Sequence, residues 1–112
     1  MLLLAALLLA TLAPPLERRC GWLHNPTPAN WWLTDRDGQW TLSTQGSAPV
    51  DGWEDVGGSH GAEWVETNGS YGYGCACMTV RTDRRRGEVR AITRLDPRPL
   101  KACRADRALP RP

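Results

Sequence analysis

The stretch YGYGCACMTVRTD (residues 71–83) decides the fold, because its side chains separate cleanly with a period of two. Successive side chains of a β-strand point to opposite faces of the sheet. One face carries Tyr71, Tyr73, Cys75 and Cys77. The other face carries Gly72, Gly74, Ala76, Met78 and Val80. The pattern predicts one long strand with an aromatic, cysteine-bearing face and a second face on which small residues allow close packing.

Strand patterns lie on both sides of this segment, and a turn joins each of them to it. Residues 63–67 (EWVET) are strand formers, and Asn68-Gly69 behind them is a strong hairpin signal because both residues accept a positive φ. On the other side, RRRG (84–87) predicts a turn, and residues 88–95 alternate as a further strand that two prolines end. Residues 99–107 then predict a short helix opened by proline.

A second hairpin is predicted upstream, in WWLTDRDGQWTLST (residues 31–44), with Asp37-Gly38 as its turn. Because Trp31 and Trp32 are adjacent, they must point to opposite faces, so one of them faces away from the main core. Residues 25–28 (NPTP) predict a stiff, extended lead-in to this hairpin. The Gly-rich residues 45–62 predict a long loop that is functional or mobile.

The composition favours a small β-domain with few aliphatic side chains. Residues 17–112 contain six Leu, five Val and one Ile, so six Trp and two Tyr must supply much of the core. A chain of this size buries only about 60–65% of its surface on folding and needs cross-links. We expect residues 17–112 to form a single all-β domain: a small antiparallel sheet of about five short strands, stapled by disulfides, with a short C-terminal helix.

The N-terminal residues predict export. Residues 2–13 (LLLAALLLATLA) are continuously apolar, but they are too few for the ~20 residues that span a bilayer and fit the core of a signal peptide. We therefore expect residues 1–16 to be a signal peptide, the mature protein to be periplasmic or secreted, and no membrane span to remain after its removal.

Four cysteines fit this oxidising location. An even number in a small exported chain predicts two disulfides, formed by Cys20, Cys75, Cys77 and Cys103. Cys75 and Cys77 share one face of one strand, with parallel Cβ vectors, so a bond between them is the least favourable pairing. We expect Cys20 and Cys103 each to bond one member of this pair, and the sequence leaves open which. The usual paired knuckles of a zinc site are missing, so no metal is predicted.

Charge is distributed unevenly along the chain. Residues 20–70 hold seven acids and one base, whereas residues 71–112 hold four acids and eleven bases. One interpretation is internal complementarity between neighbouring strands, and the other is a basic edge that faces a partner. An exported protein rarely meets nucleic acid, so we expect no nucleic-acid binding.

Three strings of this sequence resemble conserved blocks of a known family. They are CGWLHNPTPANWWLTDRDGQWTLSTQG (20–46), EWVETNGSYGYGCACMTV (63–80) and PLKACR (99–104). The chain is similar, from about Cys20 to Leu109, to short exported bacterial proteins catalogued as domain of unknown function 4087. The resemblance implies an exported bacterial domain and carries over no catalytic residue.

The sequence contains no recognisable catalytic, cofactor or metal motif, and neither His24 nor His60 has a ligand-spaced partner. We therefore expect a binding module that is not an enzyme and uses no cofactor. The candidate binding residues are the aromatic side chains Trp31, Trp32, Trp53, Tyr71 and Tyr73. The predicted role is binding of an envelope protein, as an inhibitor or immunity protein does; the alternative is envelope glycan bound through exposed Trp. The oligomeric state is left open.

Overall fold

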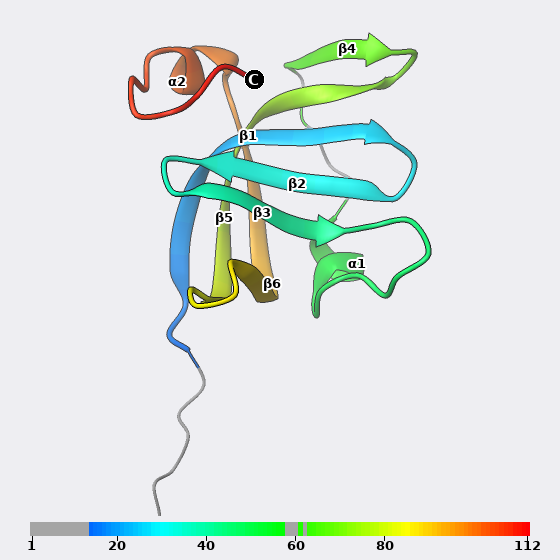
Figure 1. The fold of residues 1–112 in the computed structure, drawn as a ribbon. Coiled ribbons are helices and arrows are strands. Elements are labelled where there is room, and N and C mark those ends of the chain that lie inside the picture. Colours follow the sequence, from blue (N-terminus) through cyan, green and yellow to red (C-terminus); the bar gives the residue numbers. More distant parts are fainter. Residues whose placement is uncertain (1–13, 58–60, 62) are drawn as a thin grey trace, which may run out of the picture.

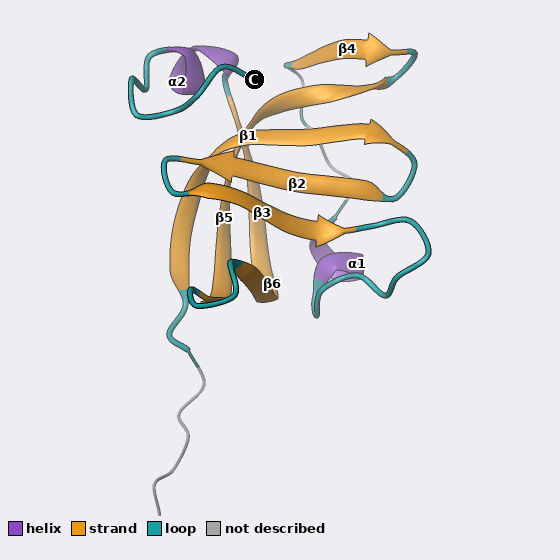
Figure 2. Ribbon diagram, viewed as in Figure 1, coloured by secondary structure: helices purple, strands orange, loops and turns teal. Residues whose placement is uncertain are grey.

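The computed structural model describes residues 14–57, 61 and 63–112, and within them the chain forms one antiparallel sheet with two short helices (Figures 1 and 2). The elements are β1 (Glu17–Thr27), β2 (Asn30–Asp35), β3 (Gly38–Ser43), α1 (Trp53–Val56), β4 (Trp64–Asn68), β5 (Tyr71–Asp83), β6 (Glu88–Arg98) and α2 (Leu100–Arg104). The all-β prediction and the short C-terminal helix are confirmed. The predicted signal peptide falls mostly outside the described residues and stays a prediction.

Strand β5 is the centre of the sheet. One edge of β5 pairs with β1, from Asn25↔Gly72 to Glu17↔Val80. The other edge is shared, because β4 pairs with the first residues of β5 and β6 pairs with the rest. The order is therefore β3-β2-β1-β5-β4, with β6 also on β5. The period-two segment on which the fold prediction rested is the strand that contacts three neighbours.

The sheet has six strands, one more than expected, because β1 was not recognised as a strand. Its residues were interpreted in part as a lead-in, since Pro26 and Pro28 cannot donate ladder hydrogen bonds. In the structure β1 ends at Thr27, and the ladder with β5 ends before the prolines, at Asn25. The prolines therefore mark the end of a long strand.

Strand β1 bends as it passes from β5 to β2, as Figure 1 shows. Gly21 of β1 lies close to β2, because a Cβ atom on it would come within 2.0 Å of the carbonyl oxygen of Thr34. Such a contact is far shorter than any that packed atoms tolerate. A glycine is therefore required here, and it lets β2 cross close above β1.

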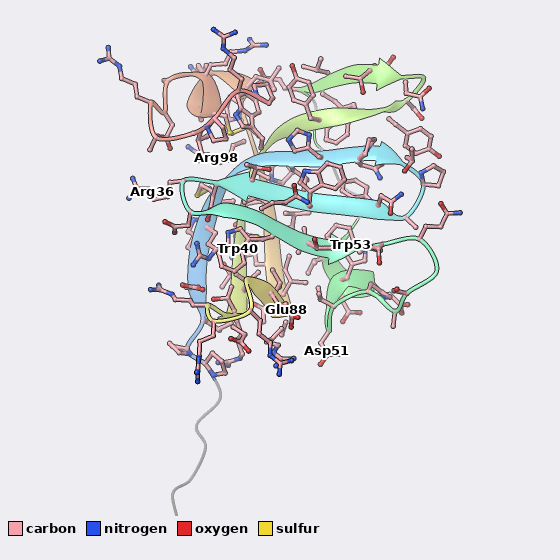
Figure 3. The ribbon with its side chains drawn as sticks, in the orientation of Figure 1. Arg36, Trp40, Asp51, Trp53, Glu88 and Arg98 are labelled. Atoms are coloured by element: carbon pink, nitrogen blue, oxygen red, sulfur yellow. A yellow bond between two sulfur atoms is a disulfide. The ribbon has the colours of Figure 1, made fainter. Side chains whose placement is uncertain are left out.

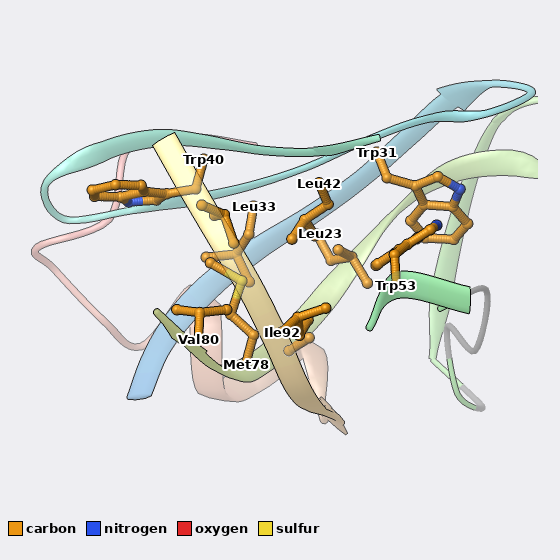
Figure 4. Packing of buried hydrophobic residues seen from close by; sticks show 11 residues of the cluster. Leu23, Trp31, Leu33, Trp40, Leu42, Trp53, Met78, Val80 and Ile92 are labelled. Carbon is orange, nitrogen blue, oxygen red and sulfur yellow. The ribbon is translucent and has the colours of Figure 1, made fainter. Parts of the chain in front are cut away.

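The inner face of the curved sheet holds the main core (Figure 4). Five of its side chains are almost completely buried: Leu23, Leu33, Leu42, Met78 and Val80. At one end of the cluster the ring centroids of Trp31 and Trp53 are 5.3 Å apart. The predicted use of Trp to fill a core that is short of aliphatic residues is thus seen directly.

The loop between β3 and β4 is held more firmly than its Gly-rich sequence predicted. The amide of Val50 donates a hydrogen bond to the carbonyl oxygen of Leu42 at 3.1 Å. The amide of Ile92 donates one to the carbonyl oxygen of Asp51 at 2.8 Å. Trp53 then inserts its ring into the core from α1. Residues 45–57 are therefore attached to both β3 and β6. Residues 58–60 and 62 lie outside the described residues.

The two disulfides join Cys20 to Cys77 and Cys75 to Cys103. Each outer cysteine thus bonds one member of the β5 pair, as their shared face predicted. The strand register supplies the choice that the sequence left open, because Cys20 lies directly opposite Cys77 in the β1–β5 ladder. Cys103 reaches Cys75 from α2 and fixes the C-terminal segment to the outer face of the sheet.

We expect the two disulfides to be reduced in a fixed order. Thiol attack requires access to a sulfur atom. Cys20 is exposed, whereas Cys75 and Cys103 retain only 5% and 3% of their accessible surface. Limited reduction of the folded protein, followed by alkylation and peptide mapping, should label Cys20 and Cys77 first. Earlier labelling of Cys75 or Cys103 contradicts this order.

Candidate functional site

The strand registers align side chains into rows across the outer face of the sheet. One row crosses β3, β2, β1, β5 and β4, and it consists of Thr41, Trp32, His24, Tyr73 and Val65. We call these five residues the aromatic row. None of them carries a carboxylate, ammonium or guanidinium group, although 26 such residues occur in the chain.

The rings of this row contact one another, one pair stacked and the other tilted. The imidazole of His24 lies 5.3 Å from the ring of Trp32 at an interplanar angle of 21°, and 5.8 Å from the ring of Tyr73 at 39°. His24 is therefore held between two aromatic neighbours. All three side chains are half-buried, so each keeps part of its ring accessible to solvent. The row is an ordered, apolar strip on an otherwise charged protein.

The position of His24 also sets its charge. Burial lowers the pKa of the His24 imidazole below its ordinary value of 6.5, because a charged ring loses hydration between two aromatic side chains. At neutral pH the ring is uncharged and stacks as an apolar group. The row therefore presents no charge of its own.

A second row lies beside the first on the same face, and its two central residues, Trp22 and Cys75, are buried. It consists of Gln39, Thr34, Trp22, Cys75 and Arg98. The indole of Trp22 is only 3% exposed and donates a hydrogen bond to the carbonyl oxygen of Pro110 at 3.0 Å. Leu100 and Leu109 pack against the same cluster. The C-terminal segment thus covers Trp22 and Cys75 of the second row and leaves the three rings of the aromatic row half-buried.

The structure separates the five predicted binding residues into two groups. Trp32 and Tyr73 lie in the aromatic row, and Tyr71 is half-buried on the same strand face. Trp31 and Trp53 are both 8% exposed and pack in the core. Both rings point into the main core, where Figure 4 shows them side by side. These two residues therefore do not contribute to a surface.

Sequence reasoning missed His24, the central ring of the row. The signal was present in the alternation of Cys20, Trp22 and His24, which share a strand face with one another. It was not used because the following prolines suggested a lead-in and not a strand. Once β1 is known to be a strand that pairs with β5, His24 falls opposite Tyr73.

A separate polar cluster closes one end of the inner face. The guanidinium of Arg19 lies 4.0 Å from the centroid of the Trp40 ring and donates to Asp35 at 2.8 Å and to Asp37 at 2.9 Å. Glu17 accepts a further hydrogen bond from Arg19. Burial by itself lowers the pKa of Arg19, but the hydrogen bonds to Asp35 and Asp37 outweigh it and hold this pKa above its usual value. Arg19 therefore stays charged.

Both carboxylate oxygens of Asp35 accept hydrogen bonds in this cluster. Its Oδ1 atom accepts hydrogen bonds from the amides of Asp37 and Gly38, at 2.8 and 3.2 Å, and from the indole of Trp40 at 2.9 Å. Two hollows of about 340 and 350 Å³ adjoin Arg19 and Asp37. Because the buried members are already paired, the arrangement fits a structural clasp on the β2–β3 hairpin better than a reactive site.

Charge complementarity between the two halves of the chain is not seen in the ion pairs. Within the described residues, no acid of 20–70 pairs with a base of 71–112. The bases of the second half pair with Glu17 or with acids of their own half, as in Arg84–Glu17 and Arg90–Asp83. The uneven charge of the sequence therefore persists on the folded surface.

Two further findings concern only the part of the chain that the structure describes. No group of three or more His, Cys, Asp or Glu side chains is arranged to hold a metal ion there. None of its helices has the length and apolarity needed to cross a membrane.

Comparison with known proteins identifies the family. Residues 15–110 match the family described as protein of unknown function DUF4087. The chain belongs to this family. The suspected resemblance is thereby confirmed over nearly all of the predicted domain. Neither curated proteins nor solved structures gave a significant match.

We predict that Asp35 contributes far more to stability than its neighbour Asp37. Asp35→Ala leaves the buried Arg19 and the Trp40 indole without their shared acceptor, so the free energy of unfolding should fall by about 3–5 kcal/mol. The side chain of Asp37 is 58% exposed, and Asp37→Ala should cost only about 0–1 kcal/mol. Urea unfolding followed by Trp fluorescence measures both. Equal losses would show that the buried pair is not special.

We also predict a pH dependence from His24. Below pH 6.5 the unfolded chain binds a proton on this residue that the folded protein resists, so the free energy of unfolding should fall as the pH drops from 7.5 to 5.5. Above that window both states are neutral and His24 contributes no slope. His24→Gln should flatten the dependence between pH 7.5 and 5.5. An unchanged slope in this variant assigns the dependence to another group.

Proposed function

We propose that this protein is a non-enzymatic binding module that holds a protein partner on the aromatic row. The observation that supports it is a strip of Trp, His and Tyr side chains in mutual ring contact, half-buried and free of charge, on the outer face of the sheet. Protein interfaces are depleted in charged residues at their centre and enriched in Tyr and Trp, which matches this composition. The cross-links Cys20–Cys77 and Cys75–Cys103 keep the surface preorganised.

The stacking favours a protein over a glycan. A sugar ring binds by lying flat on an open aromatic face, but His24 covers one face of Trp32 and lies close to Tyr73. The row also carries Thr41 and Val65 at its two ends. Such a mixed strip suits the apolar and aromatic side chains of another protein. The Arg19 cluster supports the non-enzymatic assignment, because its three acids accept hydrogen bonds from Arg19. They are Glu17, Asp35 and Asp37.

Export places such a module in the bacterial envelope or outside the cell, and two disulfides fit that location. A small, cross-linked, non-catalytic domain at this place is suited to hold or inhibit an envelope protein. This part of the proposal rests on location and size.

Position-specific photo-crosslinking tests the proposal. A photoreactive phenylalanine analogue at position 32 or 65 should form a discrete protein adduct in envelope extracts of the source organism. The adduct should disappear when Tyr73→Ser is added to the same chain. Thr93, which is exposed on β6, is the control position and should give no adduct. Adducts of equal strength from all three positions contradict a binding role for the row.

The glycan alternative is examined with the same variants. Purified peptidoglycan should not retain the protein, whether the row is intact or carries Trp32→Ser. Retention that is lost in Trp32→Ser, without any protein adduct at position 32, would replace the proposed protein partner by a glycan.

A further inference from the structure

The C-terminal segment that covers Trp22 and Cys75 is strongly basic. Five of its bases are exposed: Arg98, Lys101, Arg104, Arg107 and Arg111. We call these residues the basic rim. In the described part of the chain none of them takes part in an ion pair, and Asp106 is the one acid among residues 98–112. Glu63 is a further acid beside this segment, because its carboxylate accepts a hydrogen bond from the amide of Leu100 at 3.3 Å. With five bases against these two acids, the rim carries a net positive charge.

The basic rim adjoins the aromatic row. Arg98 lies opposite Cys75, two residues beyond Tyr73 on β5, and it begins the segment that carries the other four bases. The Cys75–Cys103 disulfide and the Trp22–Pro110 hydrogen bond fix this segment on the outer face. Figure 3 shows Arg98 beside α2, at the end of the molecule where β5 begins. An apolar strip and a cationic border thus form one continuous surface.

We infer that the partner is a protein segment in which aspartate or glutamate side chains flank an apolar or aromatic anchor. The inference rests on the proposed function, since the anchor occupies the aromatic row while the carboxylates meet the basic rim. Four of the five rim bases are arginines, whose planar guanidinium groups bind carboxylates through two parallel hydrogen bonds. Because these arginines have no internal partner, no ion pair must break before they bind.

A protein partner fits this surface better than a nucleic acid, which also seeks bases and aromatic rings. Single-stranded nucleic acids stack their bases on open ring faces. The row has its rings stacked on each other, with the imidazole of His24 between its neighbours. The positive charge also lies at one border of the row and does not follow it from β3 to β4, as a groove for a phosphate backbone requires.

The test uses a phage-displayed library of random 12-residue peptides, selected on the disulfide-bonded protein. Selected peptides should be enriched in Asp and Glu over the unselected library and should contain an apolar or aromatic residue. Their affinity, measured by fluorescence anisotropy on synthetic copies, should fall at least about tenfold in the double variant Arg98→Glu/Arg104→Glu. The matched control Arg84→Glu/Arg86→Glu makes the same change of charge at the opposite end and should leave the affinity within about twofold at 0.15 M salt.

The outcomes separate this inference from the proposed function. Selected peptides without acidic enrichment, whose binding is lost in Tyr73→Ser but kept in the rim variant, overturn the inference and leave the aromatic row as a protein-binding site. Peptides that bind independently of Tyr73, or failure to select any peptide, contradict both proposals. The same assay is run with a 20-nucleotide oligothymidylate and with phosphatidylglycerol vesicles. If either binds more tightly than every peptide, with the same dependence on Arg98, the rim belongs to another class of partner and the inference is overturned.

Discussion

The antiparallel pairing of β1 with β5 is the constraint on which the rest of the structure depends. It places Cys20 opposite Cys77 and His24 opposite Tyr73, and it turns Leu23 to the inner face beside Gly74. A shift of this register by one residue moves every side chain of β1 to the wrong face. The pairing therefore determines the core, the first disulfide and the aromatic row together. The Cys20–Cys77 bond joins two residues that face each other in this ladder, so it locks the register that the side chains select.

The two faces of the sheet are stabilised by different physical means. Near the start of β1, Arg19, Asp35 and Trp40 form a buried polar clasp that holds the β2–β3 hairpin over the core. A buried ion pair stabilises little by itself, but removal of one member is costly, so such a pair specifies geometry more than it adds stability. On the outer face, Trp22 and the Cys75–Cys103 bond hold the C-terminal segment by apolar packing. The hairpin and the C-terminal segment are thus both fixed relative to the aromatic row.

The sequence predicted those parts of the fold that depend on local pattern. The alternation in β5 and the turn at Asp37-Gly38 follow from the preferences of neighbouring residues, and both are present in the structure. The choice of Cys77 over Cys75 as the partner of Cys20 could not be predicted, because it depends on a ladder between segments 57 residues apart. The burial of Asp35 was missed for a similar reason. Its position before a turn suggests an exposed residue, and only Arg19 from β1 makes a buried carboxylate tolerable there.

The sequence predicted only part of the candidate surface, because the face on which an aromatic side chain lies depends on long-range strand pairing. Adjacent Trp31 and Trp32 had to face opposite ways, but alternation alone does not say which of them is buried. That choice follows from Leu23 and Leu33, which lie opposite each other on the inner face. Trp31 is two residues before Leu33 and therefore lies on the same face.

The consequence is unusual for a protein with so few aliphatic residues. Burial of a large aromatic side chain is among the strongest stabilising contributions available to such a core, yet Trp32 and Tyr73 remain half exposed on the outer face. The C-terminal segment covers Trp22 in the neighbouring row and leaves them partly uncovered, although it is anchored to the same strand at Cys75. A fold that needed these rings only for stability would gain by covering them completely, so their partial exposure beside the basic rim is the feature on which the proposed contact with a partner rests.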